Sequence, residues 1–450
     1  MSTRRAIRGA PYISESSVTE PYKRNSSQDE SAQASHGAST RRRPRPLAIL
    51  AILVPLALMV VAVSLFATVL RPAVREQVVA PTTGGPSQAP SAASSERTAG
   101  NEADKHTASA AFDASAVAPK TPWLPLAPQT TLTRIGVGSC IHQNHPQPLW
   151  TDIIADKPQL FLAIGDNVYG DVKSADMTEL IAAYRTQLGH PEFAAARKAI
   201  PFLATWDDHD YGANDAGASF AHRERAAALF HAFWQIPAND GSGSGISYAR
   251  TYGPEGRRVQ IIMLDTRSFR SPLTRKTETF PHWGKYEPDP DPSRTMLGAQ
   301  QWRWLETELR KPAEIRLVVS SIQVLAEGHG WERWGNLSAE RDRLIALIEK
   351  TGATGVIMLS GDRHMGAVYE REIAGPRLIA ELTASSINRS YGPSKDAVGP
   401  PLVSDRYHAE NYGLIEIDWA ARTLRLSLKG LSGKTHYARE VAFSRLGMDG

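Results

Sequence analysis

The chain has 450 residues, of which 42% are hydrophobic and 22% are charged, so its composition is that of a globular protein and excludes a largely disordered or collagen-like one. Residues 1–46 hold nine basic and four acidic residues, whereas the whole chain has a net charge of only +4. The excess of positive charge therefore lies in this N-terminal segment. The rest of the chain gives no specific indication of a nucleic-acid partner.

The N-terminal segment is followed by a candidate membrane anchor. Residues 1–46 are polar and Ser-rich, which predicts a disordered tail, and residues 47–70 are an uncharged, mostly apolar run of 24 residues. A helix of that length crosses a bilayer of about 30 Å. The arginines at 41–43 and 45 place the tail in the cytoplasm by the positive-inside rule. We therefore expect a single-pass anchor in the cytoplasmic membrane, with the rest of the chain outside; a cleaved signal peptide is the alternative.

Residues 71–129 are rich in Ala, Pro, Ser, Thr and Gly and lack periodicity, which is typical of a disordered linker. Trp123 within it is a candidate for the first residue packed on the following domain. From 130 to 450, strand and helix patterns alternate, which predicts one α/β domain with two packed sheets. Strands are predicted at 134–138, 160–164, 202–206, 259–264, 315–320 and 355–359, helices at 176–188, 219–234, 298–310 and 338–350, and further strands between 376 and 443.

Four of the predicted strands end directly at side chains that bind metal ions. Cys140 follows the first of these strands, Asp166 and Tyr169 follow the second, and residues 207–210 and 362–364 follow the other two. Ligands of open α/β sheets bind at the carboxyl ends of strands. The four strand ends are therefore expected to build one metal centre.

The residue types indicate which metals this centre prefers. The carboxylates of Asp166, Asp208 and Asp362 are hard oxygen ligands, which suit Ca²⁺, Mg²⁺ or Mn²⁺. The thiol of Cys140, the only cysteine, and the phenol of Tyr169 favour a more acidic transition metal such as iron. A lone cysteine is more often an inert buried thiol. The mixture predicts unlike ions that share a carboxylate, an arrangement that stabilises the entering and leaving oxygens of phosphoryl transfer.

These motifs resemble those of the alkaline phosphatase D (PhoD-like) branch of the calcineurin-like metallophosphoesterases. The resemblance covers residues 130–450 in order and spacing, and it includes Leu264–Arg270 and Gln300–Leu305. The family implies a four-layer αββα sandwich of two mixed sheets. It also implies hydrolysis of phosphate esters by a water that bound metal ions activate, without a covalent protein nucleophile. Its motifs here are Gly-Ser-Cys140, Gly-Asp166-Asn-Val-Tyr169, Trp-Asp-Asp208-His209-Asp210 and Ser-Gly-Asp362-Arg-His364.

The resemblance assigns the metal ligands to two ions. Asp166 would bridge the ions, Asp208 and Asp362 would hold one of them, and a set of softer ligands would hold the other. By resemblance the ions are Fe³⁺ and Ca²⁺, with Zn, Mn or Mg as alternatives. The softer set consists of Cys140, Tyr169 and His364.

The resemblance also implies catalytic roles for two residues beside the ligands. His209 would stabilise the transferring phosphate or protonate the leaving oxygen, and Asp210 would orient His209. Arg363 either contacts the substrate phosphate or forms a salt bridge. Asp207 is the alternative to Asp208 as a metal ligand.

One ligand of the wider superfamily is missing, and one charged residue has a structural interpretation. The superfamily has a metal-binding His before the last motif, but residues 318–323 contain none, so Gln323 or a water is the candidate replacement. Arg267 is expected to form a structural salt bridge near the site. Trp331 and Trp334 either line a pocket or pack within their loop.

The sequence thus predicts a metal-dependent phosphatase that acts on a phosphate monoester or diester outside the cytoplasmic membrane. The alternatives are a phosphodiesterase or phospholipase-D-like activity on envelope lipids or polymers, and a non-catalytic metal-binding envelope module. His209 argues against the module, because metal storage needs no positioned acid. Hydrolysis by a serine nucleophile is disfavoured, because no Gly-x-Ser-x-Gly motif is present. The sequence indicates neither the oligomeric state nor the natural substrate.

Overall fold

The structure is a computed structural model that describes residues 112–448, apart from 238–244, 376 and 397–400. The expected tail at 1–46, the expected transmembrane helix at 47–70 and the linker as far as residue 111 lie outside the described residues. Within the described residues, no helix combines the length and the apolar character that crossing a membrane requires.

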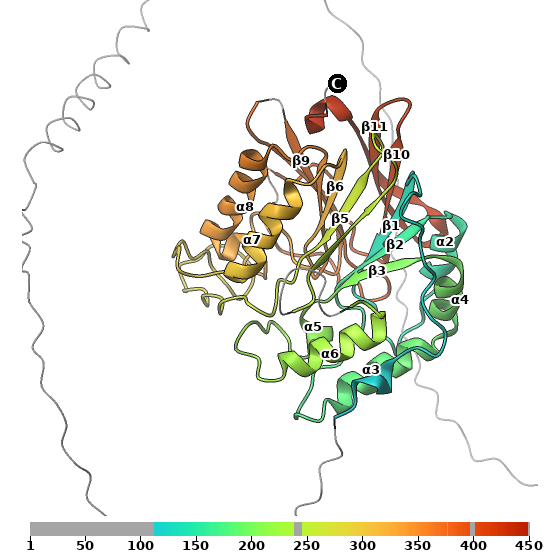
Figure 1. The fold of residues 1–450 in the computed structure, drawn as a ribbon. Helices are drawn as coiled ribbons and strands as arrows, with labels where there is room; N and C mark the ends of the chain where they lie inside the picture. Colours follow the sequence, from blue (N-terminus) through green and yellow to red (C-terminus); the bar gives the residue numbers. More distant parts are fainter. Residues whose placement is uncertain (1–111, 238–244, 376, 397–400, 449–450) are drawn as a thin grey trace, which may run out of the picture. The chain divides into compact units, whose positions relative to one another are not determined.

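Two six-stranded mixed sheets form the centre of the domain (Figure 1). The strands of the first sheet are β1 (Arg134–Gly138), β2 (Leu160–Ile164), β3 (Phe202–Thr205), β10 (Asn411–Asp418), β11 (Thr423–Gly430) and β12 (Thr435–Ala442). Their order across the sheet is β12-β11-β10-β1-β2-β3. The strands β1, β2 and β3 are parallel to one another, whereas β10 runs antiparallel to both of its neighbours.

The second sheet is built in a similar way. Its strands are β4 (Tyr248–Tyr252), β5 (Val259–Met263), β6 (Ile315–Val319), β7 (Val356–Ser360), β8 (Gly366–Glu372) and β9 (Leu378–Ala384). Their order is β4-β5-β6-β7-β9-β8, and the four inner strands are parallel. The edge strands β4 and β8 are antiparallel to their neighbours.

The predicted sheet strands are confirmed within one residue at each end from 134–138 to 355–359. Four of them, β2, β5, β6 and β7, are buried at every position. Strands covered on both faces read as continuous apolar runs. This continuity explains why the sequence pattern located these strands so closely.

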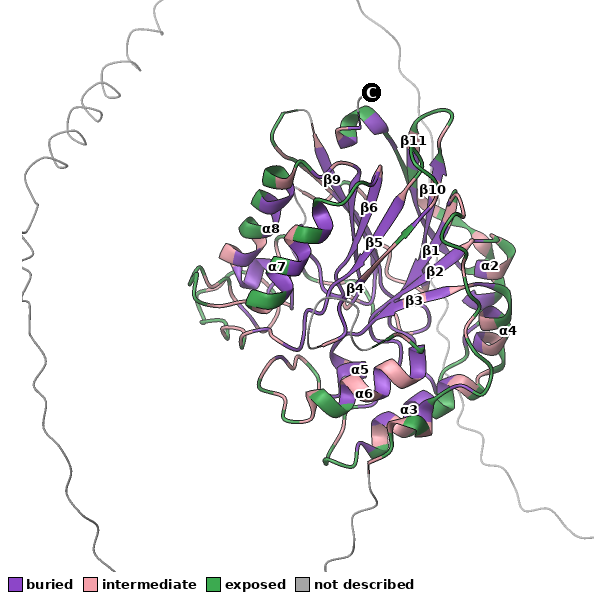
Figure 2. Ribbon diagram, viewed as in Figure 1, coloured by how far each residue is buried: buried purple, intermediate pink, exposed green. Residues whose placement is uncertain are grey.

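Helices cover the outer faces of both sheets (Figure 2). One hydrophobic cluster, which includes Ile135, Leu162, Ile261 and Leu317, takes its side chains from both sheets. A second cluster joins the first sheet to four helices, and a third joins the second sheet to two others. The helices are α2 (Leu149–Ala155), α3 (Thr178–Gly189), α4 (Pro191–Ala199) and α6 (Arg223–Trp234) on the first sheet, and α7 (Gly298–Leu309) and α8 (Ser338–Thr351) on the second.

Short helical turns complete the described fold. They are η1 (Ala114–Val117), α5 (Asp208–Tyr211), η2 (Trp334–Asn336), η3 (Leu431–Gly433) and η4 (Phe443–Leu446). Among them, α5 matters most for function, because it begins within the third of the predicted ligand motifs. Its capping box is formed by Asp207 and Asp210.

The carboxyl ends of the parallel strands from the two sheets are joined by hydroxyl side chains. Thr205, at the end of β3, donates a hydrogen bond to the carbonyl oxygen of Leu264 at 2.8 Å. Ser321, just after β6, donates to the carboxylate of Asp207 at 2.8 Å. A β-bridge also pairs Ser139 with Ser385. The loops that carry the predicted ligands therefore lie at one common edge of the two sheets.

Part of the expected linker is packed on the domain. The Trp123 ring stacks on Trp234 with ring centres 4.6 Å apart, and its Nε1 donates a hydrogen bond to the carbonyl oxygen of Phe233 at 2.8 Å. The guanidinium of Arg197 lies 4.2 Å from the Trp123 ring centre. Trp123 thus packs on the domain as expected, but packing begins before it, because Val117 is fully buried and Phe112 lies against the same hydrophobic cluster. Residues 112–129 therefore differ from the disordered linker that their composition predicts, since these apolar side chains make tertiary contacts.

We expect Trp123→Ala to lower the free energy of unfolding by about 2 kcal/mol, because it removes a half-buried indole and one hydrogen bond. Urea unfolding measures this change. Leu124→Ala is the matched control, since Leu124 is 37% exposed and its loss should change the free energy by about 0.5 kcal/mol or less. Equal effects of the two substitutions would show that Trp123 does not anchor the segment.

Candidate metal centre

The predicted ligands from separate strand ends lie together in the fold. The described residues contain four overlapping groups in which all candidate ligand atoms lie within 4.8 Å of one another. The first two groups share Asp166, and the last three share Asp208, so the four form one continuous cluster. The groups are Cys140, Asp166 and His364; Asp166, Asp208 and His209; Asp207, Asp208 and Asp362; and Asp208, Asp215 and Glu332.

The backbone is strained where it presents four of these ligands. Cys140, Asp166, Asp362 and His364 have φ angles of 57°, 48°, 65° and 53°. Positive φ is unfavourable for residues with a side chain, and such strain concentrates at functional sites. Ten non-glycine residues of the described chain have positive φ, and four of the ten belong to the predicted ligand set.

Two glycines allow the ligand loops to approach one another. Gly165, directly before Asp166, has a φ of 112°, and a Cβ atom added there would lie 2.7 Å from the Cβ of Asp207. A Cβ at Gly361, directly before Asp362, would lie 2.4 Å from the Oγ of Ser139. A side chain at either position would push the loops apart.

Asp166 lies at the centre of the cluster. Its Oδ2 accepts a hydrogen bond from the Tyr169 hydroxyl at 3.1 Å and lies 3.7 Å from the Cys140 sulfur. Its Oδ1 accepts the backbone N–H of His209 at 3.3 Å. The carboxylate therefore faces the soft ligands with one oxygen and the third motif with the other, which is the geometry that a bridging ligand needs.

The thiol and the phenol of this cluster need a cation in order to ionise. Burial raises the pKa of both Cys140 and Tyr169, and the negative charge of Asp166 raises it further. Metal binding requires the thiolate and the phenolate, so a cation must supply the compensating charge. The two side chains fit a metal site for this reason and would be protonated without one.

His364 presents one ring nitrogen to the cluster in its neutral form. Its Nδ1 is hydrogen-bonded to the carbonyl oxygen of Arg389, which fixes that nitrogen as the N–H and leaves Nε2 with a free lone pair. Burial lowers the pKa of His364 to about 4. Its ring also stacks on Tyr391 with centres 4.1 Å apart. A neutral, oriented imidazole is the form that binds metals.

Asp207 and Asp208 have different partners. The Nε of Arg267 donates to Oδ1 of Asp207 at 2.6 Å, and its Nη1 donates to Glu332 at 2.7 Å. Burial alone would lower the pKa of Arg267, but the Asp207 and Glu332 carboxylates outweigh it and raise that pKa. The expected salt bridge of Arg267 is therefore confirmed. Asp208 instead lines a cavity, where its oxygens accept two backbone N–H groups, and Oδ1 lies 3.9 Å from Nη2 of Arg267.

Asp362 carries a carboxylate without a donor. Among the described residues, no side chain or backbone group donates a hydrogen bond to it, although it borders the same cavity. Its pKa is raised by burial and by the nearby Asp207, Glu332 and Asp208 carboxylates. An acceptor of this kind is stabilised by a bound cation. The donor set around the cavity therefore fits metal ions.

His209 is oriented by Asp171 rather than by Asp210. Its Nδ1 lies 2.9 Å and 3.0 Å from the two oxygens of Asp171. Burial alone would lower the pKa of His209, but Asp166 and Asp171 raise it to about 10. The expectation that Asp210 orients His209 is therefore wrong. The Asp210 carboxylate instead accepts the backbone N–H of Asp207 and both the backbone N–H and the side-chain amide of Asn167. Asp210 instead holds two ligand loops together.

Gln323 does not replace the missing superfamily histidine. Its amide donates to the Tyr369 hydroxyl at 3.1 Å and to Thr383 at 2.9 Å, and its oxygen is 3.1 Å from Nε2 of His329. The side chain is buried outside the cavity lining. Glu332 lines the cavity instead. Glu332 lies outside the predicted ligand motifs, and its only signal in the sequence is a carboxylate in the Gly- and Trp-rich loop after β6.

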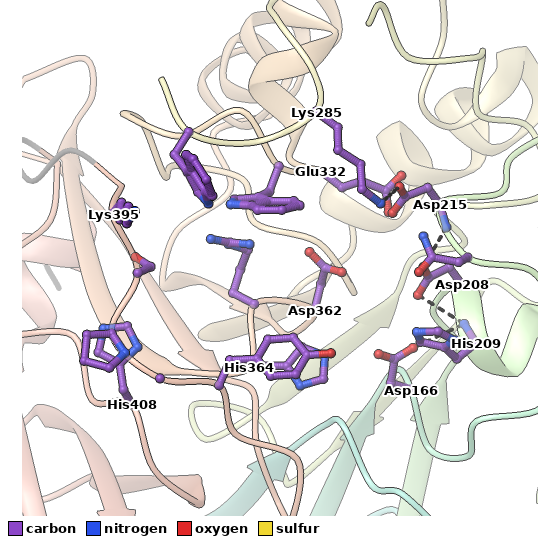
Figure 3. A pocket seen from close by; sticks show the side chains of 18 residues that line it. Asp166, Asp208, His209, Asp215, Lys285, Glu332, Asp362, His364, Lys395 and His408 are labelled. Atoms are coloured by element: carbon purple, nitrogen blue, oxygen red, sulfur yellow. Dashed lines mark hydrogen bonds and ion pairs between the residues drawn. The ribbon is translucent and has the colours of Figure 1, made fainter. Parts of the chain in front are cut away.

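The cluster opens into a cavity of about 480 Å³ (Figure 3). Asp166, Asp208, Asp362 and His364 border it, so the ions and a substrate would share one space. Arg363 lines the cavity too, and its ion pair with Asp396 at 2.7 Å confirms the salt-bridge interpretation. Contact of Arg363 with substrate stays a prediction. Trp331 is part of the cavity wall, whereas Trp334 is fully buried.

The comparisons with known proteins agree with these motifs. The model of the PhoD-like phosphatase family matches residues 135–418. The chain belongs to this family. The family resemblance of the motifs is thereby confirmed.

Three similar proteins complete the comparison. Alkaline phosphatase D of Bacillus subtilis (strain 168) is 25% identical over 246 residues, which cover 46% of this chain and 42% of that protein. The match therefore spans less than half of the relative's length. A solved structure of PhoD superposes with a TM-score of 0.57 at 16% identity, covering 72% of this chain and 70% of that one, which shows a common fold. A solved GAP50 of Plasmodium gives a TM-score of 0.45 at 12% identity, covering 71% and 91%.

We expect Asp208→Asn to release one of the two expected ions and Asp207→Asn to destabilise the fold. Asp207→Asn leaves the buried Arg267 without one of its anionic partners, which should lower the free energy of unfolding by about 3 kcal/mol. Asp208→Asn removes a carboxylate from the cavity but leaves the closer Asp207–Arg267 pair in place, so the metal-free protein should lose less stability than Asp207→Asn does. Mass spectrometry of bound metal and urea unfolding of the metal-free protein measure the two effects. Loss of bound metal in Asp207→Asn, together with the larger loss of stability in Asp208→Asn, would instead make Asp207 the ligand.

We expect Asp171→Asn to lower the pKa of His209 in the metal-free protein. Because the folded-state pKa is about 10 and the unfolded one is about 6.5, His209 stabilises the fold fully below pH 6.5 and loses this contribution as pH rises through 10. Titration of the His209 ring by NMR, assigned with His209→Gln, measures the midpoint. Asp176→Asn, an exposed change in the same segment, is the control. An unchanged midpoint in Asp171→Asn would exclude Asp171 as the partner.

Proposed function

We propose that the domain hydrolyses phosphate esters with the help of bound metal ions. The observation that carries this proposal is the continuous cluster of ligand groups, which places a carboxylate without donors and the imidazole of His209 on one cavity. Membership of a phosphatase family supports the same reaction. A phosphate monoester and a diester both fit the proposal.

The proposed ions are Fe³⁺ and Ca²⁺. Cys140, Tyr169 and His364 suit iron because they offer sulfur, a phenolate oxygen and nitrogen, whereas Asp208 and Asp362 offer the oxygens that calcium prefers. Asp166 lies between the two sets. When bound, the ions supply positive charge for the phosphate oxygens and activate water for hydrolysis.

The chain itself supplies a proton donor. With Nδ1 held by Asp171, the other ring nitrogen of His209 is left to face the cavity, and the hydrogen bond to the Asp171 carboxylate raises the pKa of His209 and so favours the protonated ring. The imidazolium can stabilise charge on the phosphate or protonate the leaving oxygen, which is general acid catalysis. The Asp171 carboxylate keeps the ring in one orientation during this transfer.

We further propose that the reaction takes place outside the cytoplasmic membrane. The support is the basic and apolar pattern of residues 41–70, which lie outside the described residues. A phosphodiesterase or phospholipase-D-like activity on envelope lipids or polymers is compatible with this location. Parallel assays on a monoester, a diester and a phospholipid distinguish these substrates.

We expect Asp166→Asn to lower kcat on an aryl phosphate by about a thousandfold or more and to lower the bound metal, because the amide cannot bridge two cations. Steady-state kinetics and elemental analysis of the same preparation test this. Asp291→Asn, an exposed change in another loop, is the control and should leave both quantities unchanged. Full activity of Asp166→Asn would rule out the proposed centre.

A further inference from the structure

The cavity is larger than a phosphate group requires. Its volume of about 480 Å³ falls among sites that enclose organic ligands of about 300–1,000 Å³. Figure 3 shows Asp208 and Asp215 on one side of it and Lys395 and His408 on the other. A phosphate held beside the acidic groups, near Asp362, leaves the opposite half for the rest of a substrate.

Exposed aromatic side chains border this opposite half. Trp283 is 51% exposed and Tyr391 is 55% exposed, and both line the cavity. Five large hydrophobic side chains are exposed in the described part of the chain, and these two are the aromatic ones among them. The Tyr391 ring stacks on His364, so the aromatic rim begins beside a candidate metal ligand. Exposed rings around a cavity are typical of sites that bind planar groups.

Positive charge surrounds the same half of the cavity. The Lys395 Nζ lies 5.1 Å from the Trp283 ring centre, and no carboxylate of the described residues forms an ion pair with it. Arg363 and Arg406 share one carboxylate, that of Asp396, at 2.7 Å and 3.6 Å. Two cations with one anion, together with an unpaired lysine, give this half of the cavity a local excess of positive charge that complements an anion.

We propose that Trp283, Tyr391, Arg363 and Lys395 form a leaving-group subsite for an alcohol that carries a planar ring and a second negative charge. The substrate class is thus an aromatic phosphate ester with an anionic substituent. This proposal rests on the proposed hydrolysis. Water adds to phosphorus as the bond to the leaving oxygen breaks, and that oxygen departs with a proton. The products are inorganic phosphate and a phenol whose hydroxyl is neutral and whose ring carries the anionic substituent. The ring packs against the aromatic rim while the anion is attracted by Lys395 and Arg363.

The test compares two substrates that differ in one charge. They are 4-carboxyphenyl phosphate and its neutral isostere 4-carbamoylphenyl phosphate, hydrolysed by the metal-loaded protein. We expect kcat/KM to favour the carboxylate by about fivefold at low salt, and this preference to decline with added salt because salt screens an exposed charge. Lys395→Gln should reduce the ratio of the two kcat/KM values towards one. Lys198→Gln, on the outer helix α4, is the matched control and should retain the parent ratio.

A second variant tests the aromatic part of the subsite. Trp283→Leu should lower kcat/KM for both aryl substrates about fivefold relative to methyl phosphate, because the ring loses its stacking surface. If the parent and Lys395→Gln show the same ratio of kcat/KM for the two aryl substrates, the proposal of an anionic subsite is wrong. Hydrolysis of these substrates would still support the proposed function. If the metal-loaded parent hydrolyses none of the three monoesters, the subsite proposal fails, and if it also hydrolyses no phosphate diester, the proposed function fails with it.

Discussion

Repulsion among carboxylates held in one poorly solvated cluster is the constraint on which the rest of this structure depends. Two unit charges 4 Å apart interact by about 4 kcal/mol at the effective dielectric of a protein surface. Asp166, Asp208 and Asp362 lie in overlapping groups at such separations. The fold holds these charges together only if other parts of the chain or bound cations neutralise them.

Protein groups neutralise one side of the cluster and leave the other side for ions. Arg267 is buried between Asp207 and Glu332, and Arg270 forms a second ion pair with Glu332 at 2.7 Å. No arginine or lysine forms an ion pair with Asp362 within the described residues. The same division separates structural carboxylates from candidate ligands, although Asp207 and Asp208 are neighbours in sequence.

Much of this arrangement could be predicted from short runs of sequence. The buried strands end directly at Cys140, Asp166 and Asp362, and parallel strands bring their carboxyl ends to one edge, so the cluster follows from local patterns and topology. Contacts that depend on loop conformation could not be predicted. Asp171 rather than Asp210 holds His209, because α5 turns the Asp210 carboxylate toward backbone N–H groups.

The same limit applies to residues whose environment is built by distant segments. Glu332 enters the cavity from a loop without a strand-end motif, and Gln323 is drawn into a buried hydrogen-bond network with Thr383. Trp123 lies in a segment of linker-like composition and packs on residues more than a hundred positions later. Composition and spacing carry no information about such partners.

Anomalous X-ray diffraction from crystals of the metal-loaded domain, recorded on both sides of the iron absorption edge, tests the central claim most directly. We predict an iron peak in contact with Cys140, Tyr169 and His364, and a second, non-iron peak beside Asp208 and Asp362, with Asp166 between them. Maps without metal density at these side chains, in a protein that hydrolyses phosphate esters, would contradict the account.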